Sequence, residues 1–178
     1  ITHYIQTSNM NNGLLEREKE LNAELEKKID ERTIELIEKN RQLDFLSNQD
    51  TVTSLYNRRF FLQELNSRVQ ANGRDKRIAL AFLDLDRFKT INDTYGHFIG
   101  DNILIELAKR LTSLNIPDTM IARLGGDEFV IAFWGNLPLS SVENSLEEIS
   151  AKCSEPIFLS EYIFQITTSI GLSVYPTD

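Results

Sequence analysis

The stretch that decides the fold is Met120-Ile121-Ala122-Arg123-Leu124-Gly125-Gly126-Asp127-Glu128-Phe129-Val130-Ile131-Ala132-Phe133-Trp134. Two apolar runs flank two glycines and two adjacent carboxylates, a pattern that predicts a tight β-hairpin with an acidic tip. Glycine permits positive φ angles and lets a ligand approach the backbone, and carboxylate oxygens can hold a hard cation such as Mg²⁺. The hairpin is therefore either ordinary turn chemistry or part of a nucleotide site.

A second acidic segment follows the unbroken apolar run of residues 78–83, which predicts a strand buried on both faces. The run ends in Asp84-Leu85-Asp86, and strand alternation would send the two carboxylates to the same side. Carboxylates at the end of a central strand are costly to desolvate unless they are paired or bind metal. One such aspartate alone would be taken as a helix cap, but two acidic sites together favour a shared two-metal centre.

Polar groups suited to a nucleotide occupy the next segment, residues 87–101. Lys89 can neutralise phosphate, and Asn92 and Asp101 offer an amide and a carboxylate to a purine edge. A carboxylate can accept hydrogen bonds from the N1–H and the exocyclic amine of guanine. Asp101 also precedes the helical pattern of residues 102–111, so we expect a helix N-cap, a ligand, or both.

Length and composition allow one domain plus an extension in 178 residues. The net charge of −8 argues against broad binding to nucleic acid or to anionic membranes. The sequence has no transmembrane stretch and no signal peptide, so we expect no direct membrane contact from this segment. The single cysteine, Cys153, excludes an internal disulfide and fits a reducing cytosol. We therefore expect a cytoplasmic protein or the cytoplasmic part of a membrane-bound sensor.

Residues 14–48 differ in character, because they are rich in Glu and Lys and contain no Gly or Pro. Apolar residues recur close to a heptad, with one extra residue in the seam, at Leu14, Leu21, Leu25, Ile29, Leu36 and Leu43. A parallel two-stranded coiled coil is the favoured interpretation, and a solitary amphipathic helix packed on its own domain is the alternative. Arg32 and Asn40 lie on or beside the seam, where polar residues can set the register.

Four ordered segments resemble the GGDEF family of diguanylate cyclases: residues 50–59, 82–89, 92–101 and 123–129. The resemblance extends from Asp50 to Asp178. It implies an α+β fold similar to the nucleotidyl-cyclase and polymerase palm, with a central antiparallel sheet flanked by helices. The expected organisation is the end of an upstream segment in residues 1–13, a coiled-coil signalling helix in residues 14–48 and a GGDEF catalytic domain in residues 49–178.

The resemblance also implies the reaction. Each domain is expected to bind one GTP with Mg²⁺ or Mn²⁺, and two domains face each other across a two-fold axis. Each 3′-hydroxyl attacks the α-phosphate of the opposite GTP, which releases pyrophosphate and closes cyclic di-GMP. Phosphoryl transfer of this kind depends on positioning and charge neutralisation. A homodimer through the N-terminal helix would raise the effective concentration of the second domain, and a sensor domain is expected upstream.

The resemblance also implies roles for individual residues, which are assigned by matching positions of this sequence to the family pattern. The implied metal ligands are Asp84, the Leu85 carbonyl and Asp127, and the implied catalytic carboxylates are Glu128 and Asp127. The implied substrate contacts are Asn92 and Asp101 on guanine, Val52 in the guanine pocket, Lys89 and the backbone near Arg87 and Phe88 on phosphate, and the turn glycines Gly125 and Gly126. Because Asp101 would repel adenine N1 and accept from guanine, we expect GTP specificity.

The sequence departs from the family pattern in three places. Ile116 and Thr119 occupy the positions of the Arg-x-x-Asp product site, so we expect no product inhibition there, since isoleucine donates no hydrogen bonds. Ser54 replaces the usual Gly of the first segment. The helix and basic segment that follow the last strand in the family have no counterpart before Asp178. We therefore expect that the C-terminal part is missing and that one sheet face lacks cover.

Two functions remain in competition at this point. The leading hypothesis is an active cyclase, because every acidic and guanine-contacting position is intact. The alternative is a degenerate GGDEF domain that acts as a GTP-binding or protein-interaction scaffold, which the absent basic segment favours.

Overall fold

The computed structural model describes residues 24–40, 43–72, 77–135 and 137–177. The chain divides into two compact units, Ile1–Phe45 and Leu46–Asp178, which are described separately. The proposed upstream segment of residues 1–13 and the seam residues Leu14 and Leu21 lie outside the described residues.

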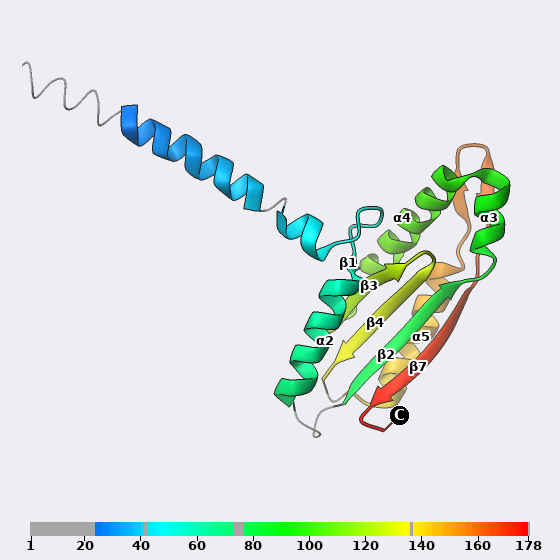
Figure 1. Cartoon of the computed structure of the whole chain (residues 1–178). Coiled ribbons are helices and arrows are strands. Elements are labelled where there is room, and N and C mark those ends of the chain that lie inside the picture. Colours follow the sequence, from blue (N-terminus) through cyan, green and yellow to red (C-terminus); the bar gives the residue numbers. More distant parts are fainter. Residues whose placement is uncertain (1–23, 41–42, 73–76, 136, 178) are drawn as a thin grey trace, which may run out of the picture. The chain divides into compact units, whose positions relative to one another are not determined.

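Residues 24–40 of the first unit are helical (Figure 1), as their composition predicts. Ion pairs one turn apart, such as Lys28–Glu24 at 3.1 Å and Lys39–Glu35 at 2.7 Å, line the exposed surface and each adds little stability. The seam residues Leu25, Ile29 and Leu36 are each more than half exposed. The described helix therefore leaves its apolar row uncovered within a single chain. Residues 43–48 are also helical.

The second unit is built on a five-stranded sheet with the strand order β1-β3-β4-β2-β7 (Figure 1). All neighbouring pairs are antiparallel except β1 and β3, which are parallel. The strands of this sheet are β1 Tyr56–Asn57, β2 Ile78–Leu85, β3 Thr119–Gly125, β4 Glu128–Trp134 and β7 Thr168–Tyr175. The helices are α2 Arg58–Asn72, α3 Phe88–Tyr95, α4 His97–Ser113 and α5 Leu139–Cys153, and β5 Ile157–Leu159 pairs with β6 Tyr162–Phe164 in a separate hairpin. The expected α+β sheet flanked by helices is confirmed.

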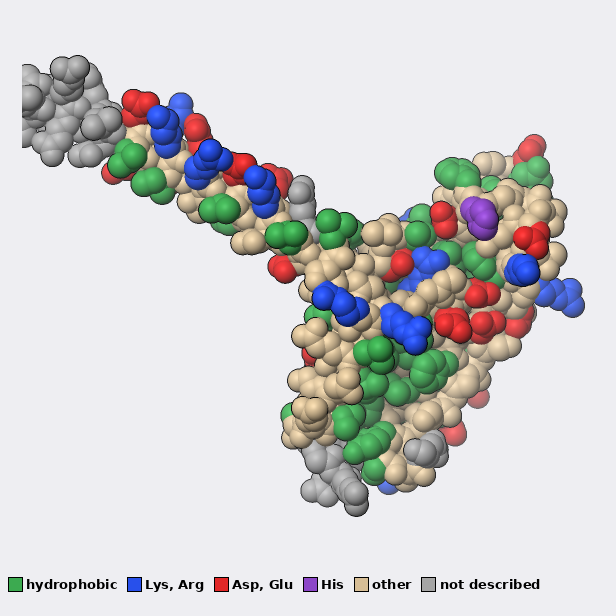
Figure 2. Space-filling view, in the orientation of Figure 1, with side chains coloured by type: hydrophobic (Ala, Val, Ile, Leu, Met, Phe, Trp, Pro, Cys, Tyr) green, Lys and Arg blue, Asp and Glu red, His purple; other side chains and the backbone are tan. Residues whose placement is uncertain are grey.

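Both faces of the central strands are covered, as the continuous apolar run of β2 predicts. Ala81, Leu83 and Leu85 point into the core formed with α4 and α5, while Ile78 shares the opposite core with Phe61 of α2. Each large side chain buried in this way contributes about 1.5–3 kcal/mol to the free energy of unfolding. Beyond α2 the cover is thinner, because Phe82 is 45% exposed. Figure 2 shows hydrophobic side chains gathered on this face of the sheet.

The helix N-cap expected at Asp101 is wrong. Helix α4 begins at His97, after Gly96 with φ +85°, so Asp101 lies inside the helix and is not its N-cap. Helix α5 begins at Leu139 after Pro138, whose fixed φ suits a helix start. Residues 165–167 lead the chain from β6 of the small hairpin into β7 of the main sheet.

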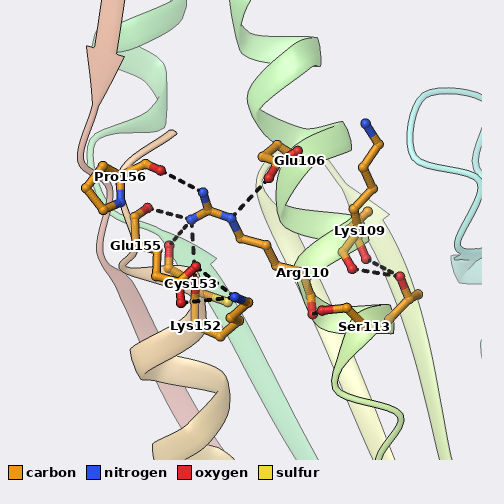
Figure 3. Close-up of polar contacts among 10 residues, drawn as sticks. Glu106, Lys109, Arg110, Ser113, Lys152, Cys153, Glu155 and Pro156 are labelled. Carbon is orange, nitrogen blue, oxygen red and sulfur yellow. Dashed lines mark hydrogen bonds and ion pairs between the residues drawn. The ribbon is translucent and has the colours of Figure 1, made fainter. Parts of the chain in front are cut away.

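A buried arginine ties α4 to the end of α5 (Figure 3). The Arg110 guanidinium donates hydrogen bonds to the carbonyls of Lys152, Cys153, Glu155 and Pro156, and its Nε lies 3.3 Å from Glu106. The last carbonyls of a helix have no partner within the helix, and a cation near them is stabilising. Arg110 thereby fixes the helix that carries Asp101. No described helix is long and apolar enough to span a membrane.

Candidate nucleotide and metal site

The acidic hairpin is formed as the sequence predicts. Gly125 pairs with Glu128, so Gly126 and Asp127 alone make the turn between β3 and β4. Gly125 has φ +141° and Gly126 has φ +55°, conformations that L side chains rarely adopt. A Cβ atom at either glycine would meet nothing within 4 Å. The backbone conformation therefore requires these glycines, and the tip remains open to a ligand.

Arg123 holds the tip of the hairpin in place through its guanidinium group. Its Nε and Nη2 donate hydrogen bonds to the Gly126 carbonyl at 3.0 and 2.7 Å, and its Nη1 lies 2.9 Å from Asp50 Oδ1. The same Asp50 oxygen accepts from the backbone and the hydroxyl of Thr53. Burial raises the pKa of the Asp50 carboxyl, but the hydrogen bonds from Thr53 and Arg123 outweigh burial and hold that pKa below its usual range.

Asp84 and Glu128 are direct cross-strand partners on β2 and β4. Desolvation, followed by the charges of Asp127, Glu128 and Asp86, raises the pKa of the Asp84 carboxyl. The structure thus brings the predicted acids together, and Figure 2 shows acidic side chains gathered on this part of the second unit. Their mutual repulsion is the electrostatic condition that a bound cation would relieve.

The donor set fits a metal that is shared with substrate. Within the described residues, no group of three or more His, Cys, Asp or Glu side chains could hold a metal by itself. Mg²⁺ usually takes one or two carboxylates together with waters and substrate phosphates rather than an all-protein cage. Two carboxylates, Asp84 and Asp127, with the Leu85 carbonyl match that smaller requirement in number and in ligand type.

Asp86, the second carboxylate of the Asp84-Leu85-Asp86 segment, is held by hydroxyl groups of the neighbouring strand. It lies just beyond β2, and its carboxylate accepts hydrogen bonds from the Thr167 hydroxyl and, at 2.8 Å, from the Ser169 hydroxyl. The bond from Thr167, then that from Ser169, lowers the pKa of the Asp86 carboxyl. Because both oxygens are engaged, Asp86 joins the end of β2 to the start of β7 instead of extending the metal set.

The two predicted guanine contacts, Asn92 of α3 and Asp101 of α4, make up what is named here the guanine notch. Asn92 Oδ1 is buried without a hydrogen-bond partner among the described residues. A Cβ atom at Gly100 would lie 1.9 Å from this oxygen, so the Asn92 side chain keeps this position only while residue 100 is glycine. Asp101 is the next residue and is exposed. A buried acceptor without a donor is uncommon in proteins, and a guanine N–H group is a donor of the kind that is missing.

Basic side chains and the first N–H groups of a helix lie beside the acids Asp84 and Asp86. A cavity of ≈ 730 Å³ is lined by Asp84, Asp86, Arg87 and Thr90, among others. Arg87, with φ +62°, is the N-cap residue before α3, and the first N–H groups of that helix, at Phe88 and Lys89, have no partners within the helix. The side chains of Arg87 and Lys89 are exposed. A helix N-terminus beside basic side chains suits a phosphate.

The remaining predicted positions are consistent with this arrangement. Val52 is partly buried against the core cluster that contains Phe88 and Ile103. At the position of the family's product site, Ile116 and Thr119 line a cavity of ≈ 370 Å³. None of the described residues that line it is charged, and the Thr119 hydroxyl donates to the Ile116 carbonyl at 2.7 Å.

A family model described as "Diguanylate cyclase, GGDEF domain" matches residues 47–178. The bifunctional diguanylate cyclase/cyclic di-GMP phosphodiesterase MucR of Pseudomonas aeruginosa is 37% identical over 159 residues, which cover 89% of this chain and 23% of MucR. Diguanylate cyclase TpbB of the same species is 37% identical over 146 residues, covering 79% of this chain and 33% of TpbB. The chain thus spans a third or less of these relatives.

Solved structures give the same result. The coiled coil and GGDEF domain of DgcB from Caulobacter crescentus, in complex with c-di-GMP, superposes with a TM-score of 0.71 at 31% identity. It covers 84% of this chain and 82% of that chain. Diguanylate cyclase SiaD from Pseudomonas aeruginosa, in complex with its activator SiaC, gives a TM-score of 0.67 at 30% identity, covering 96% of this chain and 67% of that chain.

Proposed function

Because the chain belongs to the GGDEF family of diguanylate cyclases, we propose that residues 49–178 bind GTP and, as a pair of domains, condense two GTP into cyclic di-GMP and pyrophosphate. The observation that carries this proposal is the convergence of Asp84, Asp127 and Glu128 on one edge of the sheet. A scaffold that only bound a partner would not need three repelling carboxylates beside an open glycine turn.

Guanine is held in the guanine notch. Its N–H groups donate to the unsatisfied Asn92 Oδ1 and to the exposed Asp101 carboxylate, with Val52 on the apolar side. An adenine N1 would face Asp101 with a lone pair, so the site selects GTP over ATP. Discrimination by a buried polar group left without its partner can be large, on the order of 10⁴-fold in favourable cases.

The triphosphate lies against the start of α3. The free N–H groups of Phe88 and Lys89, with the side chains of Arg87 and Lys89, neutralise phosphate oxygens, and the open backbone of Gly125 and Gly126 lets the chain approach them. Asp84, Asp127 and the Leu85 carbonyl would hold Mg²⁺ or Mn²⁺, which would supply positive charge against the phosphate oxygens during transfer. Glu128 is exposed beside Asp84 and accepts the proton of an incoming 3′-hydroxyl.

The second domain comes from a second copy of the chain. The uncovered apolar row at Leu25, Ile29 and Leu36 is what a parallel coiled coil buries, and it would join two chains through residues 14–48. A homodimer built in this way raises the local concentration of the partner domain. We assign residues 1–13 to the end of an upstream sensor segment and place the domain in the cytoplasm, where GTP is available.

The proposal is tested by incubating the purified chain with GTP and Mg²⁺, with ATP in parallel, and separating products by mass-resolved chromatography. We expect cyclic di-GMP from GTP only. Asp127→Ala with Glu128→Ala should abolish product while the circular dichroism spectrum is unchanged. In the same samples, Mg²⁺ with GTP should raise the melting temperature of the unchanged chain more than that of the variant. Nucleotide binding without product in the unchanged chain would instead support a scaffold.

A further inference from the structure

A further cavity lies at the end of the sheet opposite the acidic hairpin. Its volume is ≈ 400 Å³, and the described residues that line it come mainly from the start of β2, the ends of β4 and β7 and the start of α5. Ala79 of β2 pairs with Phe133 of β4 beside this cavity, whereas Asp84 and Glu128 pair further along the same two strands. At about 3.3 Å per strand residue, positions 79 and 84 are about 17 Å apart. The cavity is therefore separate from the nucleotide site.

The lining of this space, named here the Arg77 cavity, is mostly apolar. Ala79, Phe133 and Val142 line its inner side and belong to the buried core. The rest of its apolar lining is only partly covered and consists of Leu137, Leu139, Leu172 and Val174. Pockets of roughly 300–1,000 Å³ that are lined mainly by apolar side chains, with a few polar groups, are typical of small-molecule sites. A ligand of this cavity is therefore expected to be largely apolar.

Arg77 is the one charged side chain among the described residues that line the cavity. It is exposed, and it forms no ion pair with any described residue. A guanidinium presents its N–H groups in a planar fork that matches the two oxygens of a carboxylate. Because the chain has a net charge of −8, its overall field does not attract anions, and a local cation has to do so. Arg77 therefore gives the apolar cavity a specific place for one negative charge.

We propose that the Arg77 cavity binds a small amphipathic carboxylate, with its alkyl or aromatic tail against Phe133 and Val142 and its carboxylate on Arg77. A neutral apolar molecule would make no use of the guanidinium. Inorganic phosphate would gain nothing from the apolar lining. The inference does not depend on the reaction at the acidic hairpin, because the described linings of the Arg77 cavity and of the ≈ 730 Å³ cavity have no residue in common.

Isothermal titration of the whole chain with octanoate tests the proposal, with octanol as the neutral ligand of the same length. We expect octanoate to bind at one saturable site. Each buried methylene strengthens binding about fourfold, so hexanoate should bind about tenfold more weakly than octanoate. Saturating GTP with Mg²⁺ should leave the octanoate dissociation constant within about twofold, because distant sites act independently.

Two variants separate the contribution of the charge from that of the apolar lining. Arg77→Met should weaken octanoate about fivefold and leave octanol within about twofold, since only octanoate carries a charge. The matched control is Arg58→Met, at an exposed arginine of α2 that does not line the cavity, and it should change neither ligand. Leu172→Phe fills part of the cavity and should weaken both ligands about tenfold, with circular dichroism confirming that the variant is folded.

An absence of saturable octanoate binding, or octanoate that GTP displaces, would overturn the proposal. An equal effect of Arg77→Met on octanoate and octanol would overturn it as well, because the guanidinium would then not hold the carboxylate. Amide chemical shifts of the unchanged chain locate the ligand without any substitution. Octanoate should shift the signals of Gly135 and Leu172, and shifts confined to Gly126 and Asp127 would contradict the assignment.

Discussion

The guanidinium of Arg123 lies 2.9 Å from the carboxylate of Asp50, which joins the acidic hairpin to the turn that opens the second unit. The two side chains are only 9% and 21% exposed. Arg123 also holds the Gly126 carbonyl, so one side chain contacts both the entry to the domain and the tip of the hairpin. The geometry of Asp127 therefore depends on a residue near the end of the helical segment.

Replacing Arg123 with Met tests this dependence. Arg123→Met keeps most of the apolar stem but leaves Asp50 and the Gly126 carbonyl without their donor. We expect the free energy of unfolding to fall by about 1–3 kcal/mol. We also expect a loss of product formation that exceeds the loss of GTP binding, because the hairpin tip rather than the guanine notch is released. Urea denaturation and steady-state kinetics measure the two effects.

The matched control for Arg123→Met is Lys152→Met, which removes an exposed ion pair with Glu155 at 2.8 Å. Such pairs contribute about 0–1 kcal/mol, so this variant should be close to neutral in both measurements. If the two variants behave alike, Arg123 does not position the hairpin.

Asp50→Asn should destabilise the domain in a pH-dependent way. The pKa of the Asp50 carboxyl is lowered in the folded state, so the ionised group contributes stability above the unfolded pKa. That contribution is lost as the pH falls through the folded pKa. The difference in unfolding free energy between the unchanged chain and Asp50→Asn should therefore be largest near neutral pH and shrink in acid. A difference that stayed constant from neutral to acidic pH would contradict the assignment.

Gly100→Ala should damage the guanine notch. The added Cβ would lie 1.9 Å from the buried Asn92 Oδ1, so α3 and α4 must separate or Asn92 must turn. Forced overpacking of this kind costs about 1–3 kcal/mol, and GTP affinity should fall with it. Thermal unfolding and isothermal titration with GTP measure the two quantities.

Gly171 of β7 provides the control, because a Cβ atom there would meet nothing within 4 Å. Gly171→Ala should leave the melting temperature and GTP binding nearly unchanged. Adding Asn92→Ala to Gly100→Ala should restore stability without restoring GTP binding. Restoration of both properties would show that Asn92 is not a guanine contact.

The features that local sequence could predict are those that depend on neighbouring residues. The hairpin follows from the two glycines between apolar runs, and the central strand from the run that ends in Asp84. That Asp84 and Glu128 lie close together could be predicted only by considering the two acidic segments together with the family pattern. These are short-range patterns whose physical cause lies within a few residues.

The contacts that sequence reasoning missed are long-range hydrogen bonds. Asp86 was expected on the same side of the strand as Asp84, but its partners could not be predicted: Thr167 and Ser169, 81 and 83 positions away, engage its carboxylate. Arg110 looked like an ordinary helical arginine, yet it binds carbonyls 42 to 46 positions away. Asp101 looked like a helix cap because its position after Gly100 fits that pattern, whereas the helix had already begun after Gly96.

Insertions after Asn48 test whether the N-terminal helix transmits its orientation to the catalytic domain. Each inserted helical residue rotates the preceding helix by about 100°, so two residues turn it by about 200° and seven return it close to its starting phase. We expect product formation to fall with two or five inserted residues and to recover with seven. Alanine insertions keep the segment helical, and analytical ultracentrifugation confirms that every variant still dimerises. A rate that is independent of insertion length would show that the helix acts only as a tether, since a tether is insensitive to phase.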